Sequence, residues 1–239
     1  PCSEIILRPN QFCNLTEIVV RAGDTINTLT RKIKVATLLG TIQSTFTNFG
    51  YLRKVWQDNT EEERLLGVSL TGIMDSELLN GRETGLAKTL EKLKKVAVDC
   101  NKEYAEKFNI NQSTAITCVK PSGTVSQLVD SASGIHARHN PYYIRTVRGD
   151  NKDPLTEFMK ASGIPSEPDV MKPEHTTVFS FPMMAPKGSV CRTDMTAIEQ
   201  LEIWKCYAKH WCEHKPSVTI SVKEEEWVPV GAWCWENFD

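Results

Sequence analysis

Apolar residues recur at helical spacing in the first part of the chain. One such stretch begins at a plausible N-cap, Asp24, and runs to about Phe49, with apolar residues at 26, 29 and 33 and with Gly50 as its end. The run 59–63 is typical of a capped helix start, because its carboxylates would lie near the positive end of the helix dipole. Further helices are expected over about 84–108, from near 153, and over about 196–213.

Short apolar runs between turn-forming residues indicate strands. The runs are 4–7, 15–20, 66–73, 115–119, 142–148, 176–181 and 217–222. Pro9 and Asn10 suggest a turn between the first two, and the pattern of 66–73 is that of a buried strand. Strands that alternate with long helices predict an α/β fold, and the long connections favour parallel neighbours within the sheet. There is no internal repeat.

Composition and charge narrow the class of protein. The chain has 239 residues, 40% of them hydrophobic and 24% charged, with a formal net charge of -2. This balance gives no reason to expect nucleic-acid or membrane-surface binding. No apolar run reaches the ~18 residues of a membrane span, and no secretory signal is visible. Eight scattered cysteines predict a reducing compartment, hence a cytoplasmic location. Because the chain opens at Pro1 and stops abruptly, we expect a fragment.

Two cysteines near the amino end are candidates for chemistry. Cys2 and Cys13 are 11 positions apart (13 − 2), and Glu4 follows Cys2 by two. Residues two apart in an extended backbone point to the same side, so a thiol and a carboxylate would share one face. Such a pair can combine hydrogen-atom or nucleophilic chemistry at sulfur with proton transfer at oxygen. Buried, inert cysteines are equally compatible with the sequence, and a disulfide would need an oxidising compartment.

A second candidate is the small-residue loop that follows the run 115–119. It reads Lys120-Pro121-Ser122-Gly123-Thr124-Val125-Ser126. Its backbone N–H groups are able to approach an anion, especially where a loop opens into a helix. A plain turn is the competing interpretation. The loop is not a Walker A motif, because the Gly-Lys-Ser/Thr ending is missing.

These two segments resemble ribonucleotide reductases. Pro1-Cys2-Ser3-Glu4 is similar to the Asn-Pro-Cys-x-Glu loop at the centre of that family, and Phe12-Cys13-Asn14-Leu15-Thr16-Glu17 to the barrel strand that carries one partner of the reducing thiol pair. The separation of 11 agrees with the class II, cobalamin-dependent branch. A Pro-Ser-Gly-Thr loop binds substrate phosphates in that family, and the runs 67–75 and 133–145 are also similar, the former favouring the monomeric, triphosphate-reducing type.

The resemblance implies a fold and an activity. Residues 1–239 would be the C-terminal part of the barrel catalytic domain: the second half of an α/β barrel with its central finger loop. Cys2 would carry a thiyl radical generated with adenosylcobalamin, Glu4 would accept the 3′-hydroxyl proton, and Cys13 would be half of the reducing dithiol. Residues 121–125 would bind the substrate phosphates. The implied partners are a ribonucleotide, a thioredoxin-type reductant and a dNTP effector bound elsewhere.

The chain also departs from the family pattern. The Asn before Pro1, the second reducing cysteine and the cysteine tail are absent, so we expect this chain alone to be inactive. Cobalamin contacts cannot be assigned, and His136 and Arg138 fit either a ligand site or the protein interior. We interpret Tyr142-Tyr143 as strand packing without a radical role.

Two alternative functions stay open. The first is the large subunit of a class I reductase, which shares Cys2, Glu4 and Cys13. The second is a non-catalytic nucleotide-binding or zinc-binding scaffold built on Cys206, His210 and His214, although no second cluster completes a zinc ligand set.

Overall fold

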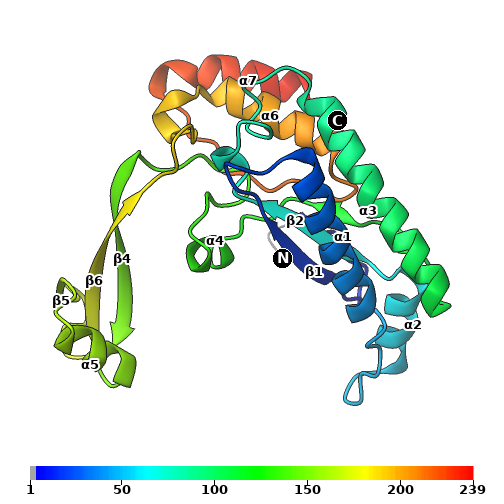
Figure 1. Cartoon of the computed structure of the whole chain (residues 1–239), viewed down its shortest axis with the longest axis horizontal. Coiled ribbons are helices and arrows are strands. Elements are labelled where there is room, and N and C mark those ends of the chain that lie inside the picture. The colour runs from blue at the N-terminus through cyan, green and yellow to red at the C-terminus, as the bar shows by residue number, and fades with distance from the viewer. Residues whose placement is uncertain (1–3, 239) are drawn as a thin grey trace. The chain divides into compact units, whose positions relative to one another are not determined.

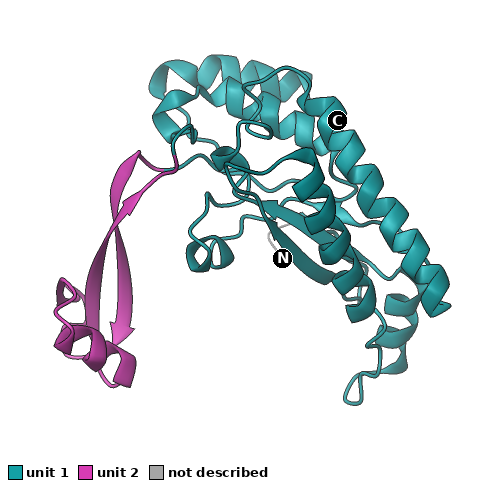
Figure 2. Ribbon diagram, viewed as in Figure 1, with its two compact units in different colours: residues 1–138, 187–239 teal, residues 139–186 magenta. Residues whose placement is uncertain are grey.

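The computed structural model describes residues 4–238, which form two compact units. The larger unit contains residues up to Arg138 and from Lys187 onward, and the smaller unit is His139–Pro186 (Figure 2). Within residues 4–238, every helix is too short or too polar to cross a lipid bilayer.

A parallel sheet is the centre of the larger unit. Its strands are β1 (Asn14–Val19), β2 (Leu66–Thr71) and β3 (Thr117–Cys118), in that order, so that β1 forms an edge. Helices α1 (Ile26–Gln43), α2 (Lys54–Glu63) and α3 (Leu86–Phe108) lie in the connections (Figure 1). The predicted α/β class and the parallel pairing are therefore confirmed.

The hydrophobic core lies between the sheet and the helices α1 and α3. Leu66, Val68 and Leu70 alternate along β2 and are fully buried, as are Leu29 and Ile33 of α1. Residues two apart on a strand share a face, which explains why one face of β2 is apolar. The other face of β2 carries the alternate residues Gly67, Ser69 and Thr71.

The first helix is shorter than predicted. It is N-capped by Thr25 instead of Asp24, whose carboxylate accepts from the Thr28 hydroxyl at 2.8 Å. It ends at Ser44 instead of Phe49, because the Ser44 hydroxyl binds the Thr41 carbonyl at 2.7 Å and Arg64 binds the Ser44 carbonyl at 2.6 Å. Side chains thus satisfy the carbonyls that another helical turn would have used.

The prediction that the run 59–63 starts a helix is wrong, because these residues end α2. Three carboxylates at a helix C-terminus face the unfavourable end of the dipole. Arg8 compensates for this, with its guanidinium 2.9 Å from a Glu62 oxygen and 3.5 Å from a Glu63 oxygen. The Thr47 hydroxyl and Gln57 amide bind Glu61 and lower the pKa of its carboxyl.

Two of the predicted strands are also wrong. Residues 4–7 form a turn and coil, and 217–222 contain no strand. The second segment meets the residue after β3 in only one bridge, Pro216 with Val119, where the Ser217 amide donates to the Val119 carbonyl at 2.9 Å. The Thr219 amide donates instead to His136 Nε2 at 2.9 Å. The remaining elements of this unit are η1 (Ile73–Asp75), α4 (Val125–Leu128), η2 (Arg192–Asp194), α6 (Ala197–His210), η3 (Glu224–Glu226) and α7 (Trp227–Glu236).

The smaller unit is an antiparallel sheet with one helix. Its strands are β4 (Tyr142–Asp150), β5 (Ser166–Pro168) and β6 (Thr176–Met184), in the order β4-β6-β5, and its helix is α5 (Pro154–Ala161). The helix start after Asp153 and both long strands are as predicted. Tyr142 is largely exposed on β4, and Arg145 lies over the Tyr143 ring, so these tyrosines are surface residues of a strand.

Candidate active site

The face of the sheet opposite α1 and α3 carries small and polar side chains. Gly67, Ser69 and Thr71 alternate with the apolar residues of β2 and are buried. At Gly67 a methyl group would lie 2.7 Å from Ile5 Cδ1 and 2.5 Å from Leu15 Cδ2. A side chain at position 67 would therefore displace Ile5 and Leu15, so the glycine lets the segment after Glu4 lie close against this face.

Glu4 is fixed in the interior at this face. Its side chain is fully buried, and its Oε1 lies 2.6 Å from Nζ of Lys120, which is 20% exposed. Its backbone carbonyl accepts from the Lys215 amide at 2.9 Å. Glu4 Oε2 is buried and has no hydrogen-bond partner among residues 4–238. A buried, paired carboxylate thus keeps one oxygen available as an acceptor.

Cys13 belongs to the same neighbourhood. Burial raises the pKa of its thiol to about 12; the positive charge of Lys120 opposes the rise, and the negative charge of Glu4 adds to it. The Cys13 sulfur is therefore a protonated thiol at neutral pH. The structure brings together Glu4, Cys13 and Lys120, whereas Cys2 lies outside the described residues.

The loop 121–125 continues directly from Lys120 and opens into the four-residue helix α4. Its residues Gly123, Thr124 and Val125 are exposed, and their backbone N–H groups have no backbone partner among the described residues. Ser122 has a φ of 54°, and its hydroxyl is buried. The Ser133 hydroxyl donates to the Pro121 carbonyl at 2.6 Å and anchors the loop.

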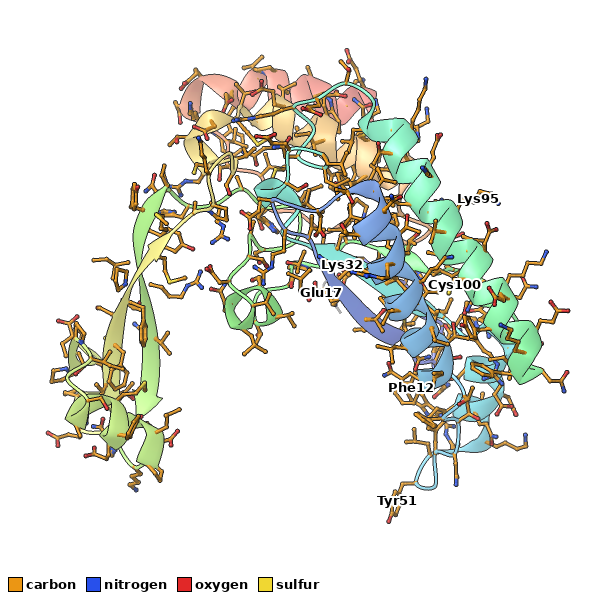
Figure 3. The ribbon with its side chains drawn as sticks, viewed as in Figure 1. Phe12, Glu17, Lys32, Tyr51, Lys95 and Cys100 are labelled. Carbon is orange, nitrogen blue, oxygen red and sulfur yellow. The ribbon has the colours of Figure 1, made fainter. Side chains whose placement is uncertain are left out.

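Glu17 and Lys120 are two polar residues of this face to which the sequence analysis gave no role. Burial raises the pKa of the Glu17 carboxyl, and the Ser122 and Ser69 hydroxyls and Lys120 oppose that rise. Figure 3 shows Glu17 on β1. Strand alternation was the available signal: Cys13 directly precedes β1 and lies four residues before Glu17, and Cys118 and Lys120 are two residues apart.

His136 and Arg138 have partners inside the larger unit. His136 Nδ1 lies 2.8 Å from the Ser133 carbonyl, and its Nε2 accepts from an amide. Arg138 is 2% exposed and forms a two-pronged ion pair with Asp75, at 2.9 and 2.8 Å. Both side chains hold the segment after the loop in place.

Cys206, His210 and His214 do not converge on a common point. Helix α6 ends at His210, whose Nδ1 lies 2.7 Å from Glu91, and His214 binds the Leu66 carbonyl at 2.7 Å. Burial lowers the pKa of His214. Within residues 4–238, no group of three or more His, Cys, Asp or Glu side chains is placed to hold a metal ion.

The chain is similar in sequence to known reductases. No protein-family model matches the chain. It is 28% identical to the adenosylcobalamin-dependent ribonucleoside-triphosphate reductase of Lactobacillus gasseri, over 95% of this chain and 34% of that protein. The reductase of the same name from Euglena gracilis is 28% identical over 94% of this chain and 30% of its own length. The homologues are cobalamin-dependent reductases.

The fold leads to the same family. A crystal structure of a B12-dependent, class II ribonucleotide reductase superposes with a TM-score of 0.81 and 25% identity, over 98% of this chain and 36% of that one. The expected resemblance to class II reductases is thus confirmed along nearly the whole chain. The chain spans about a third of the length of the relatives that it matches.

Proposed function

We propose that the chain is the part of an adenosylcobalamin-dependent ribonucleoside-triphosphate reductase that carries the reacting side chains. The observation that carries the proposal is the gathering of Glu4, Cys13 and the 121–125 loop at one face of a parallel sheet, in a chain similar to such reductases over 95% of its length. In this proposal residues 1–239 form the C-terminal part of the catalytic domain. The β1–β3 sheet belongs to the second half of an α/β barrel, and Glu4 follows the finger loop.

The reaction converts a ribonucleotide and a dithiol into a 2′-deoxyribonucleotide, a disulfide and water. A thiyl radical at Cys2 takes the 3′ hydrogen of the ribose, and Glu4 accepts the 3′-hydroxyl proton. The C2′–O bond then breaks, and the 2′ oxygen leaves as water. Cys13 and a second thiol supply two electrons and become the disulfide, after which Cys2 returns the hydrogen atom to C3′.

The two described residues suit these roles. Cys13 must deliver hydrogen, and burial keeps its thiol protonated. Glu4 must take up a proton, and its buried Oε2 has no competing partner among residues 4–238. Exclusion of water from the fully buried Glu4 carboxyl limits side reactions there.

The 121–125 loop would bind the substrate phosphates. Its three exposed amides at the start of α4 are donors without backbone partners in the described part of the chain, and backbone N–H groups of this kind bind phosphate oxygens. Because the loop begins one residue after Lys120, phosphates bound there would lie on the same side of the sheet as Glu4.

Adenosylcobalamin, when bound, supplies the radical through homolysis of its cobalt–carbon bond. The donor set fits such chemistry, since a protonated, half-buried thiol lies near a buried acceptor oxygen. None of the described residues is assigned to hold the cofactor. A thioredoxin-type reductant would regenerate the dithiol, and the dNTP effector would bind outside this chain.

The test is nucleotide reduction by a polypeptide of the relatives' full length that contains this chain. We expect turnover to require adenosylcobalamin and to be lost in Cys2→Ser, Glu4→Gln and Cys13→Ser, with Cys206→Ser as the matched control that keeps activity. Turnover in Cys2→Ser would refute the radical assignment. Turnover without cobalamin but with a second, radical-generating subunit would place the protein in class I instead.

A further inference from the structure

Lys120 is bound from three directions. Its backbone N–H donates to the Ser69 hydroxyl of β2 at 2.9 Å, and its Nζ contacts Glu4 at 2.6 Å. Gly134, with a φ of +57°, packs so closely that a methyl group there would lie 2.3 Å from the Lys120 carbonyl. The backbone of Lys120 is therefore held between β2 and the segment after the loop, so the side chain that carries the ammonium group starts from a fixed position.

Glu4 depends on this ammonium for its charge balance. The titratable groups that face Glu4 are Lys120, Cys13, Cys118 and His214. Burial raises the pKa of both thiols and lowers the pKa of His214, so these three groups are neutral near pH 7. An ionised carboxylate in a dry interior is costly unless it is paired, and Lys120 provides the pairing.

The pairing is also directional. Lys120 contacts Oε1, whereas Oε2 is the buried oxygen that has no partner among residues 4–238. Turning the carboxyl plane out of its present position would move Oε1 away from the ammonium, and a half-turn only exchanges the two equivalent oxygens, so the contact favours this orientation of the carboxyl plane. The next residue along the chain begins the 121–125 loop, so one short segment orients both the carboxyl group and the loop amides.

We propose that Lys120 is a positioning residue for Glu4: it pairs with Oε1 and thereby presents Oε2 as the proton acceptor next to the 121–125 loop. This inference rests on the proposed function for the role of Glu4. The pairing itself is a property of the 239-residue chain, and is tested first without any turnover.

The first experiment follows the Glu4 side-chain carboxyl carbon by NMR in the 239-residue chain as pH is varied, with Glu4→Gln used to assign the signal. In Lys120→Met we expect the midpoint of the titration to move to higher pH by about one unit, because the counter-charge is gone. Lys120→Arg should keep the midpoint of the parent chain. Lys32→Met is the matched control, since Lys32 of α1 is paired with Asp24 and not with Glu4 (Lys32 is labelled in Figure 3).

An unchanged midpoint in a folded Lys120→Met chain would overturn the proposal. Circular dichroism establishes whether each variant is folded. If Lys120→Met does not fold, Lys120→Gln takes its place. A folded Lys120→Gln chain with the titration midpoint of the parent would also overturn the proposal.

The second experiment measures steady-state kinetics in the full-length polypeptide with adenosylcobalamin. In Lys120→Met we expect kcat on the acidic side of the pH profile to fall by about tenfold, since the ionised fraction falls tenfold per unit of midpoint shift. KM for the nucleotide should stay within about twofold, and Lys120→Arg should recover most of kcat. A raised KM with kcat unchanged would make Lys120 a phosphate contact and overturn the positioning role.

The outcomes of the two experiments are separable. A parent polypeptide without nucleotide reduction would remove the proposed function, whereas the NMR titration would still decide whether Lys120 is paired with Glu4. Turnover in the parent with no effect of Lys120→Met on midpoint or kcat would remove the Lys120 role alone.

Discussion

Replacement of Asp75 by Asn is expected to be among the most damaging single changes to the larger unit. Asp75 and Arg138 are each 2% exposed and form two charge-assisted hydrogen bonds, at 2.9 and 2.8 Å. The Asp75 carboxylate also accepts from the Ala132 amide at 2.8 Å and from the Ser189 hydroxyl at 3.0 Å. One carboxylate therefore joins η1 to the segment after the 121–125 loop and to the chain near residue 190.

The magnitude follows from burial. Asn keeps the size of the side chain but removes the negative charge that faces the buried Arg138 guanidinium, whose ion pair with Asp130 involves a carboxylate that is 58% exposed. Loss of one partner of a buried ion pair costs roughly 3–5 kcal/mol. A folded domain has only about 5–15 kcal/mol of net stability, so the change removes a large share of it.

Urea unfolding followed by circular dichroism measures this loss. With an m-value of about 3 kcal/mol per molar urea, the midpoint should fall by about 1–1.7 M. Asp99→Asn is the control: Asp99 pairs with Lys95 on the exposed face of α3 and should change the free energy of unfolding by less than about 0.5 kcal/mol. A loss below about 1 kcal/mol in Asp75→Asn would refute the reasoning from burial.

Three further outcomes are expected. Gly67→Ala should lower the free energy of unfolding by about 1–3 kcal/mol, because its methyl would lie 2.7 Å from Ile5 Cδ1; a thermal melt equal to that of the parent would contradict this. Cys13 should be alkylated by iodoacetamide at pH 8 far more slowly than the exposed Cys234, and equal alkylation rates of the two thiols in the folded chain would count against its burial. Because the pKa of Cys13 is about 12 in the folded chain and 9.0 in the unfolded chain, its contribution to stability should be lost as pH rises from 9 to 12. Thr196→Ala, which removes the N-cap of α6, should cost about 1 kcal/mol in urea unfolding, and Thr196→Ser should recover most of it.

Local patterns in the sequence predict the long elements well. The apolar periodicity before Phe108 gives α3, and the buried run that begins at Leu66 gives β2, because each pattern repeats over several turns or residues. The acidic run 59–63 fails for a physical reason. Its charges favour a helix start only in isolation, and a distant arginine, Arg8, makes the opposite placement stable.

The sequence predicts which residues belong to the candidate site, but it does not predict which of them are in contact. Cys13 and the 121–125 loop have recognisable local sequences, and Glu4 follows a motif. The pairing of Glu4 with Lys120 joins residues 116 positions apart, so no local pattern contains it. Only the crossing of the Glu4 segment over Gly67 brings the two side chains together.

The edge position of β1 has a consequence for the isolated chain. One side of this strand has no strand partner among the described residues, and unpaired strand edges are templates on which further copies can add. Arg31 and Lys32 line the groove between β1 and α1, and Lys32 Nζ donates a hydrogen bond to the Val19 carbonyl at 2.9 Å. Positive charge along the edge repels a second identical copy. High salt screens that charge, so concentration-dependent self-association should increase as ionic strength rises.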